Sequence, residues 1–246
     1  MTFRAPLARS ERRGLAIHPG EELKHTGDMS RHTASKFRDR GQAGQMLGEA
    51  LETHGVGTDA VVLGLLRGGV PVAAALANHL GAELGALAVR KLGVPHQKEL
   101  AFGAIASYHW HTGRYLVPSV YRHALDSGPA AELEEVEVNA DAQLERLAAR
   151  FADFAPEVAG RTVVLCDDGL ATGATMHAAL DVLSRCQAAQ IIVAVPVAPR
   201  GLSDSMQGAS VTIILRSPRD FANVGGHYED FSQVDEAGIE LMLRRS

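Results

Sequence analysis

The chain has 246 residues, of which 46% are apolar and 22% charged, and its formal net charge is −5. These values are typical of a soluble globular protein and argue against a general nucleic-acid binder, which would usually show a basic surplus. No apolar run reaches membrane-spanning length, and the spacing of Cys166 and Cys186 fits neither a metal site nor a redox motif, which favours a reducing, cytoplasmic compartment.

The first 34 residues differ from the rest of the chain. They are polar, carry several arginines and show no sustained hydrophobic period. We therefore predict a flexible N-terminal extension over residues 1–34 and a single domain over residues 35–246.

From residue 35 onward, the hydrophobic pattern alternates between two periods. Apolar residues at helical spacing predict helices near residues 35–54, 70–80, 131–151, 174–185 and 201–207. Continuous apolar runs predict five strands, at residues 61–66, 84–89, 163–166, 191–195 and 211–215. Strands that alternate with helices indicate an α/β fold with a doubly wound, mainly parallel five-stranded sheet flanked by helices. Residues 91–128 depart from this pattern and predict turns with short extended pieces at 101–107 and 115–117.

The run at residues 163–175, VVLCDDGLATGAT, carries the strongest chemical signal. Asp167 and Asp168 follow a buried strand, at the carboxyl end where open α/β sheets bind ligands. The next helix begins within a short segment that offers consecutive backbone N–H groups and two hydroxyls, an arrangement that can hold a phosphate dianion. This segment consists of Ala171, Thr172, Gly173, Ala174 and Thr175. Acids beside a phosphate cradle predict a ligand that carries both hydroxyls and phosphate, together with a divalent cation.

Two further loops follow the first and second predicted strands. Arg67-Gly68-Gly69 combines a positive charge with glycines that permit close backbone approach to a ligand. Arg90-Lys91 places a basic pair at the same edge of the sheet. Each could instead be an ordinary tight turn or a solvated basic turn. Their position at the strand ends favours ligand binding for the glycine loop and for Lys91, whereas both interpretations stay open for Arg90.

The run at residues 163–175 resembles the 5-phosphoribosyl pyrophosphate (PRPP) signature of the type I phosphoribosyltransferases: four hydrophobic residues, two acids, three variable residues and Thr-Gly-x-Thr. Together with Arg-Gly-Gly-Val-Pro and Glu-Leu-Ala-x-Gly-Ala, it is most similar to bacterial phosphoribosyltransferase-domain proteins of unassigned acceptor. The resemblance implies transfer of the 5-phosphoribosyl group of PRPP to a nitrogen nucleophile, with release of pyrophosphate. It also implies the corresponding fold, with a small hood and a flexible catalytic loop, and a homodimer.

The resemblance also implies roles for the residues of these loops. The cradle would hold the 5-phosphate, while Asp167 and Asp168 would contact the ribose hydroxyls directly or through waters of Mg²⁺. The Mg²⁺ would arrive with PRPP, without a dedicated protein site. The pyrophosphate would be bound by Arg67, Gly68, Gly69 and Arg90, with Lys91 neutralising its charge. Glu99 would act on the incoming nucleophile, and a non-proline cis peptide is expected at or next to Arg67.

The acceptor is constrained by Ala171. In the 6-oxopurine enzymes of this family an Asp typically precedes the Thr-Gly pair, and here that carboxylate is missing, so we expect a base-like acceptor other than a 6-oxopurine. The aromatic stretch at residues 221–231 would form either the hood or packing at the edge of the sheet.

Two alternatives remain from the sequence. One is a non-catalytic PRPP-binding regulator, although the acidic balance speaks against the basic face that a nucleic-acid-binding regulator would show. The other is an enzyme that acts on a related nucleotide-like ligand, which dependence on PRPP or pyrophosphate would separate from the first choice.

Overall fold

The computed structural model describes residues 36–245. The extension predicted for residues 1–34 lies outside these residues. Among the described helices, none is long and apolar enough to cross a membrane.

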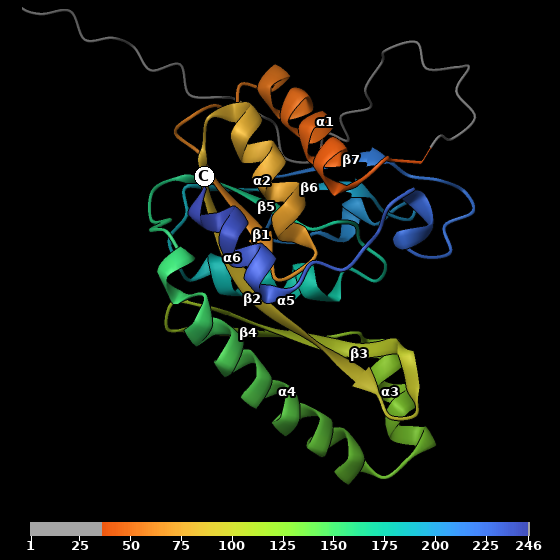
Figure 1. The fold of residues 1–246 in the computed structure, drawn as a ribbon. Coiled ribbons are helices and arrows are strands. Elements are labelled where there is room, and N and C mark those ends of the chain that lie inside the picture. Colours follow the sequence, from red (N-terminus) through yellow and green to blue (C-terminus); the bar gives the residue numbers. More distant parts are fainter. Residues whose placement is uncertain (1–35, 246) are drawn as a thin grey trace, which may run out of the picture.

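A single seven-stranded sheet organises the domain (Figure 1). Its strands lie in the order β4-β3-β2-β1-β5-β6-β7, with β1, β2, β5, β6 and β7 parallel and β3 and β4 antiparallel to their neighbours. The strands are β1 (Val61–Leu65), β2 (Glu83–Val94), β3 (Gln97–Tyr108), β4 (His111–Leu116), β5 (Thr162–Cys166), β6 (Gln190–Val197) and β7 (Val211–Arg216). The five predicted strands are all present, but the expectation of a five-stranded sheet is wrong.

The two additional strands come from the region predicted to be rich in turns. β2 continues five residues beyond its predicted end because β3 folds back against it and satisfies its backbone hydrogen bonds past the end of β1. β4 then pairs with β3 from the other side. A hairpin, with its turn at Pro95 and His96, therefore lies within residues 91–128, where turns and short extended pieces are predicted.

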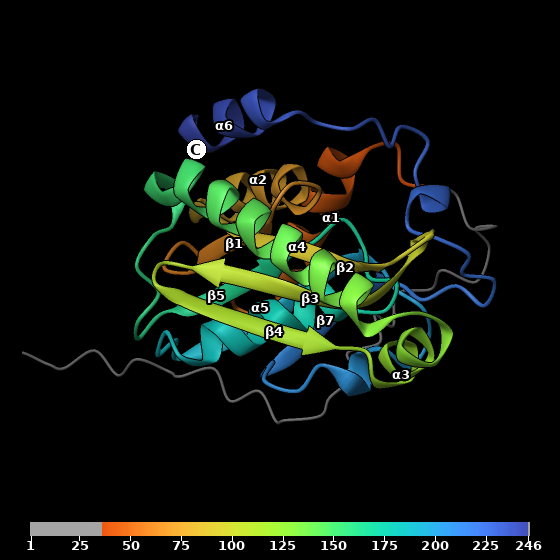
Figure 2. The same cartoon turned by 90° about the horizontal axis from the view of Figure 1, so that it is seen from below.

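Helices cover both faces of the sheet. They are α1 (Arg40–Thr53), α2 (Gly69–Leu80), α3 (Pro118–Ser127), α4 (Ala130–Arg150), α5 (Ala174–Ser184) and α6 (Glu236–Arg244). On one face, α1 and α2 pack side by side over the parallel strands, and α4 and α6 pack farther along on β2 and β3. On the other face, α5 packs over β1, β5 and the hairpin. In both views α4 runs along the hairpin strands (Figures 1 and 2).

The predicted helices differ from the observed ones at three places. The helix predicted at residues 201–207 is reduced to a 3₁₀ turn, Ser203–Ser205, and this prediction is wrong in length and type. Two short helices, α3 and α6, were not predicted. α6 begins where the Asp235 side chain accepts a hydrogen bond from the Gly238 N–H. This cap is a local signal, and a helix of only nine residues gives a weak pattern in the sequence.

The connections place the switch point of the sheet between β1 and β5. The chain runs outward from β1 to β2 on one side and from β5 through β6 to β7 on the other, so the strand order reverses between β1 and β5. Leu63 pairs with Leu165, and Gly64 pairs with Cys166, so the two strands end at nearly the same level. The loops that follow β1 and β5 therefore lie side by side at the position where doubly wound sheets bind ligands.

Gly64 provides a test of how closely α2 packs on β1. A Cβ atom added at Gly64 would lie 2.6 Å from the Val70 Cα and 2.8 Å from its N, which are backbone atoms that cannot move independently of the helix. Gly64→Ala should therefore lower the free energy of unfolding by about 1–3 kcal/mol, as overpacked core substitutions do. Urea unfolding measures this loss. Gly57→Ala is the matched control, because nothing lies within 4 Å of its added Cβ. Equal unfolding midpoints for the two variants would contradict the close packing.

Candidate active site at the switch point of the sheet

Two loops interlock at the carboxyl ends of β1 and β5. A Cβ atom on Gly68 would lie 2.3 Å from Oδ2 of Asp168, and one on Gly69 would lie 2.5 Å from the Cys166 carbonyl oxygen. No side chain fits at either position while the acids stay in place. The Leu66–Arg67 peptide is cis, as predicted. The glycine loop and the acid pair, placed about a hundred residues apart in the sequence, thus form one surface.

The predicted phosphate cradle lies at the N-terminus of α5. Gly173 precedes the helix with φ of 74°, a left-handed conformation that favours glycine. The Thr172 hydroxyl accepts a hydrogen bond from the Ala174 N–H at 3.4 Å. Ala171 and Thr172 are exposed, whereas Thr175 is buried. An exposed turn directly before the positive end of a helix is suited to an anionic ligand.

The acid pair is held by several hydrogen bonds. Arg40, the first residue of α1, donates from Nε and Nη2 to Oδ2 of Asp168 at 3.0 and 2.8 Å. The Asp168 N–H donates to Oδ1 of Asp167 at 2.9 Å, and the Tyr228 hydroxyl donates to the Asp168 carbonyl oxygen at 2.6 Å. Both acids therefore keep fixed positions while retaining some exposure to solvent.

The surroundings of the acids disfavour their ionised forms. Burial, and then the charge of Asp168, raise the pKa of Asp167 to about 8. Burial also raises the pKa of Asp168, although the Arg40 guanidinium and the Lys91 ammonium act in the opposite direction. Carboxyls with a raised pKa in a crevice are a frequent mark of a functional site. A ligand that brings positive charge or hydrogen-bond donors would stabilise their ionised forms.

The predicted basic residues differ in their exposure and in the face of β2 from which they extend. Arg67 and Lys91 are exposed, and the charge of Lys91 acts on both acids. Arg90 lies opposite Ile105 on β3, whereas Lys91 lies opposite Ala104, and consecutive strand residues point to opposite faces. The Arg90 side chain thus extends from the face of β2 opposite to that of Lys91. Its Nε is buried without a hydrogen-bond partner among the described residues.

Glu99 lies on β3, near the turn of the hairpin. Its side chain falls outside the described part of the structure, so its predicted action on the nucleophile stays a prediction.

The aromatic stretch at residues 221–231 packs against the edge of the domain near the acids. Tyr228 packs on Phe37, with ring centroids 5.4 Å apart, and Val224 lies against Gly169. In Figure 2 this C-terminal segment runs past the start of α1 before it enters α6. Of the two roles predicted for it, packing at the edge of the domain is present in the structure.

The site also contains residues that the sequence analysis missed. Arg40 and Tyr228 contact Asp168, and Phe231 lies against Arg40, but all three lie more than 50 residues away from Asp168 in the chain. A lone arginine at the start of an amphipathic helix gives no sequence signal of such a contact.

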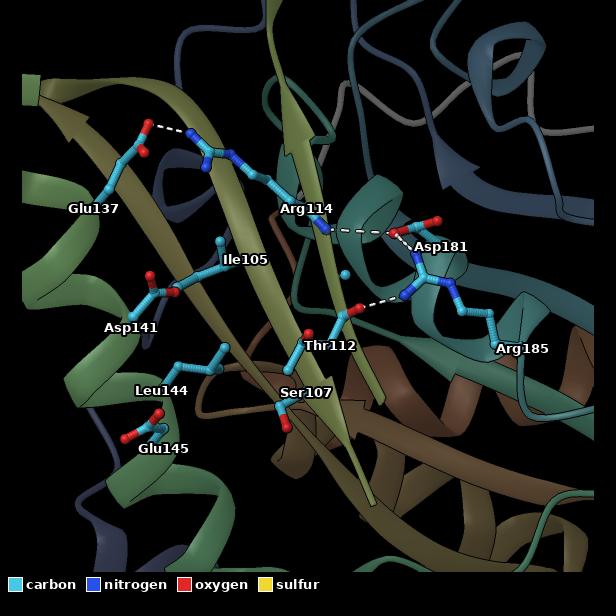
Figure 3. Close-up of a pocket in the computed structure, with 11 residues that line it drawn as sticks. Ile105, Ser107, Thr112, Arg114, Glu137, Asp141, Leu144, Glu145, Asp181 and Arg185 are labelled. Atoms are coloured by element: carbon cyan, nitrogen blue, oxygen red, sulfur yellow. Dashed lines mark hydrogen bonds and ion pairs between the residues drawn. The ribbon is translucent and has the colours of Figure 1, made fainter. Parts of the chain in front are cut away.

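A separate hollow of about 640 Å³ lies between α4, β4 and α5 (Figure 3). Its charged residues pair mostly with each other, as Arg114 does with Glu137 and Arg185 with Asp181. The Arg185 guanidinium donates to the Thr112 carbonyl oxygen, and the Arg114 N–H donates to Asp181 at 3.4 Å. These groups cover the outward backbone of the edge strand β4, which protects the sheet from further strand pairing.

No group of three or more His, Cys, Asp or Glu side chains that could hold a metal ion occurs among residues 36–245. The carboxyl groups of Asp167 and Asp168 lie at the end of β5.

Comparison with known proteins identifies relatives for most of the chain. The family model described as the phosphoribosyl transferase domain matches residues 42–212. Two strains of Mycobacterium tuberculosis carry a protein, provisionally named a phosphoribosyl transferase, that is 41% identical over 215 residues. The match covers 85% of this chain but 47% of that protein, so the chain spans about half the length of these curated relatives.

A solved structure shares both the sequence and the fold. The crystal structure of TT1426 from Thermus thermophilus is 38% identical, with a TM-score of 0.66. The match covers 85% of this chain and 98% of TT1426.

The raised pKa of Asp167 predicts how stability depends on pH. In the unfolded chain this carboxyl ionises near pH 3.9, whereas in the folded protein it keeps its proton up to about pH 8. The unfolded state thus binds fewer protons, and stability falls as the pH rises through this window. Asp167→Asn should raise the free energy of unfolding by about 1–3 kcal/mol at pH 8, with little change at pH 4.

Urea unfolding at pH 4, 6 and 8 measures this effect. Asp59→Asn is the matched control, because Asp59 is exposed and its replacement should leave the pH dependence of the wild type unchanged. If Asp167→Asn raised the free energy of unfolding by the same amount at all three pH values, this would contradict a buried, protonated carboxyl.

Proposed function

Because the chain belongs to the phosphoribosyl transferase domain family, we propose that it transfers the 5-phosphoribosyl group of PRPP to a nitrogen nucleophile and releases pyrophosphate. The observation that carries this proposal is the interlocked arrangement at the switch point of the sheet. Gly68 and Gly69 contact the acid pair, and the acid pair leads directly into the phosphate cradle at the start of α5. A ligand with a phosphate, ribose hydroxyls and a pyrophosphate matches this order of chemical groups.

The donor would be bound from both ends of its ribose. The N–H groups and hydroxyls of residues 171–175 would hold the 5-phosphate at the positive end of α5. Asp167 and Asp168 would accept hydrogen bonds from the ribose hydroxyls and offset the positive charge that develops on the sugar as the C1–oxygen bond breaks. Their oxygen atoms also suit Mg²⁺, which keeps several waters and would be shared with the substrate phosphates.

The glycine loop and the basic residues would serve the leaving group. Gly68 and Gly69 permit the backbone to approach the pyrophosphate closely, and the exposed charges of Arg67 and Lys91 would neutralise it. The electron pair of the broken C1–oxygen bond leaves with pyrophosphate, and the nitrogen of the acceptor forms the new bond to C1. Positioning and electrostatic stabilisation would supply most of the rate.

For the acceptor, we propose a base-like nitrogen compound other than a 6-oxopurine. Ala171 is exposed at the entrance to the cradle and offers no carboxylate to an acceptor proton. An acceptor that needs such a carboxylate would find no partner at this position.

Calorimetric titration with PRPP, with and without Mg²⁺, tests the donor assignment. We expect micromolar binding that depends on Mg²⁺, and its absence at millimolar PRPP would overturn the proposal. Asp168→Asn should abolish binding while the protein stays folded, since the ribose loses a charged acceptor. Asp59→Asn, on the exposed surface, should bind like the wild type. Wild-type affinity in Asp168→Asn would contradict the role of the acid pair.

The phosphate cradle is tested by Thr172→Val, which keeps the shape of the side chain but removes its hydroxyl. This variant should bind ribose 5-phosphate about tenfold more weakly, because a hydrogen bond to a charged phosphate is lost. The same measurement on Thr58→Val, an exposed threonine before β1, should show no change. Equal affinity of Thr172→Val and the wild type would argue against the cradle.

A further inference from the structure

Arg40 joins three parts of the chain at the acid pair. Its Nε and Nη2 both donate to Oδ2 of Asp168, and its Nη1 donates to the Ser232 carbonyl oxygen at 2.9 Å. Its guanidinium lies 3.8 Å from the centre of the Phe231 ring. The Arg40 side chain is only 11% exposed, so these contacts hold it in one place.

The Asp168 side chain is fixed on one side only. Oδ2 lies between the Arg40 guanidinium and the backbone of Gly68. A Cβ atom added at Gly68 would lie only 2.3 Å from this oxygen. Oδ1 makes no hydrogen bond to any described residue, so it is the oxygen that remains for a ligand. The main chain of Asp168 is fixed separately, by the Tyr228 hydroxyl.

We propose that Arg40 is a positioning residue that acts through Asp168: by holding Oδ2, it presents Oδ1 to a ribose hydroxyl of the bound donor. This inference rests on the proposed function, because it requires the acid pair to bind the ribose. Arg40 itself does not touch the donor.

The planar guanidinium suits this role better than an ammonium would. It makes two bonds to Asp168, one bond to the C-terminal segment and a stacking contact with Phe231 at the same time. A lysine has a single charged atom and cannot reproduce this set of contacts. Ser232 and Phe231 contact Arg40, and Arg40 in turn contacts Asp168. The C-terminal segment thus supports the donor site without contacting the ribose.

Two phosphate esters separate this role from a purely structural one. Ribose 5-phosphate uses both the cradle and the acid pair, whereas ethyl phosphate carries the phosphate without the ribose hydroxyls. Titration followed by NMR gives the affinity for each ligand. The wild type should prefer ribose 5-phosphate by about tenfold or more, as expected for hydrogen bonds to a charged group.

Arg40→Met should reduce this preference to about twofold or less, because the Asp168 carboxylate is no longer held. Its affinity for ethyl phosphate should stay within about twofold of the wild type, since the cradle does not depend on Arg40. Arg40→Lys should give an intermediate preference. Arg38→Met is the matched control, because Arg38 lies two residues away, is 70% exposed and pairs with Asp39. This variant should show the same preference for ribose 5-phosphate as the wild type.

Each outcome decides between the roles. The positioning role would be overturned if Arg40→Met kept the wild-type preference for ribose 5-phosphate over ethyl phosphate, or lost affinity for both esters equally. Either result would leave the proposed function intact. If Arg40→Met does not fold, Arg40→Lys decides, and a full preference in that variant overturns the role. A wild type without any preference would instead overturn the proposed function, and the role of Arg40 with it.

Discussion

The close approach of the glycine loop to the acid pair is the contact on which the site depends. Gly68 and Gly69 lie against Asp168 and Cys166 so closely that a single methyl group would separate the loops. This approach is possible because β1 and β5 are neighbours in the sheet and end at the same level. The position of the acids, the start of α5 and the path of the chain after β1 all follow from this geometry.

The surrounding protein stabilises an arrangement that is electrostatically costly. Two adjacent carboxyls in a packed crevice resist ionisation, and the charges of Arg40 and Lys91 offset part of that cost. The apolar strands below the acids, such as Val163 to Cys166, are fully buried and hold the backbone in place. The free energy of the core thus supports a polar surface that the acids alone would not stabilise.

The sequence could predict the central part of this site but not the residues that contact it from distant parts of the chain. Asp167, Asp168 and residues 171–175 form one continuous run with a strand before it and a helix after it, so local pattern was sufficient. Arg67 to Gly69 follow the same logic, and the cis peptide lies where it was predicted. Arg40 and Tyr228 reach Asp168, and Ser232 reaches Arg40, only through tertiary contacts. The β2–β3 hairpin was missed because its strands are stabilised by pairing with each other rather than by a strong apolar pattern.

By itself, the sequence determined the α/β class, the five parallel strands and the two loops that we propose carry the chemistry. It could do so because buried strands, helix starts and phosphate-binding turns depend on residues that are close together in the chain. Only the tertiary structure decided the seven-stranded sheet, the divergence of Arg90 from Lys91 and the contact of Arg40 with Asp168. These features depend on which distant segments become neighbours, and that choice is made by packing over the whole domain, which local sequence patterns do not encode.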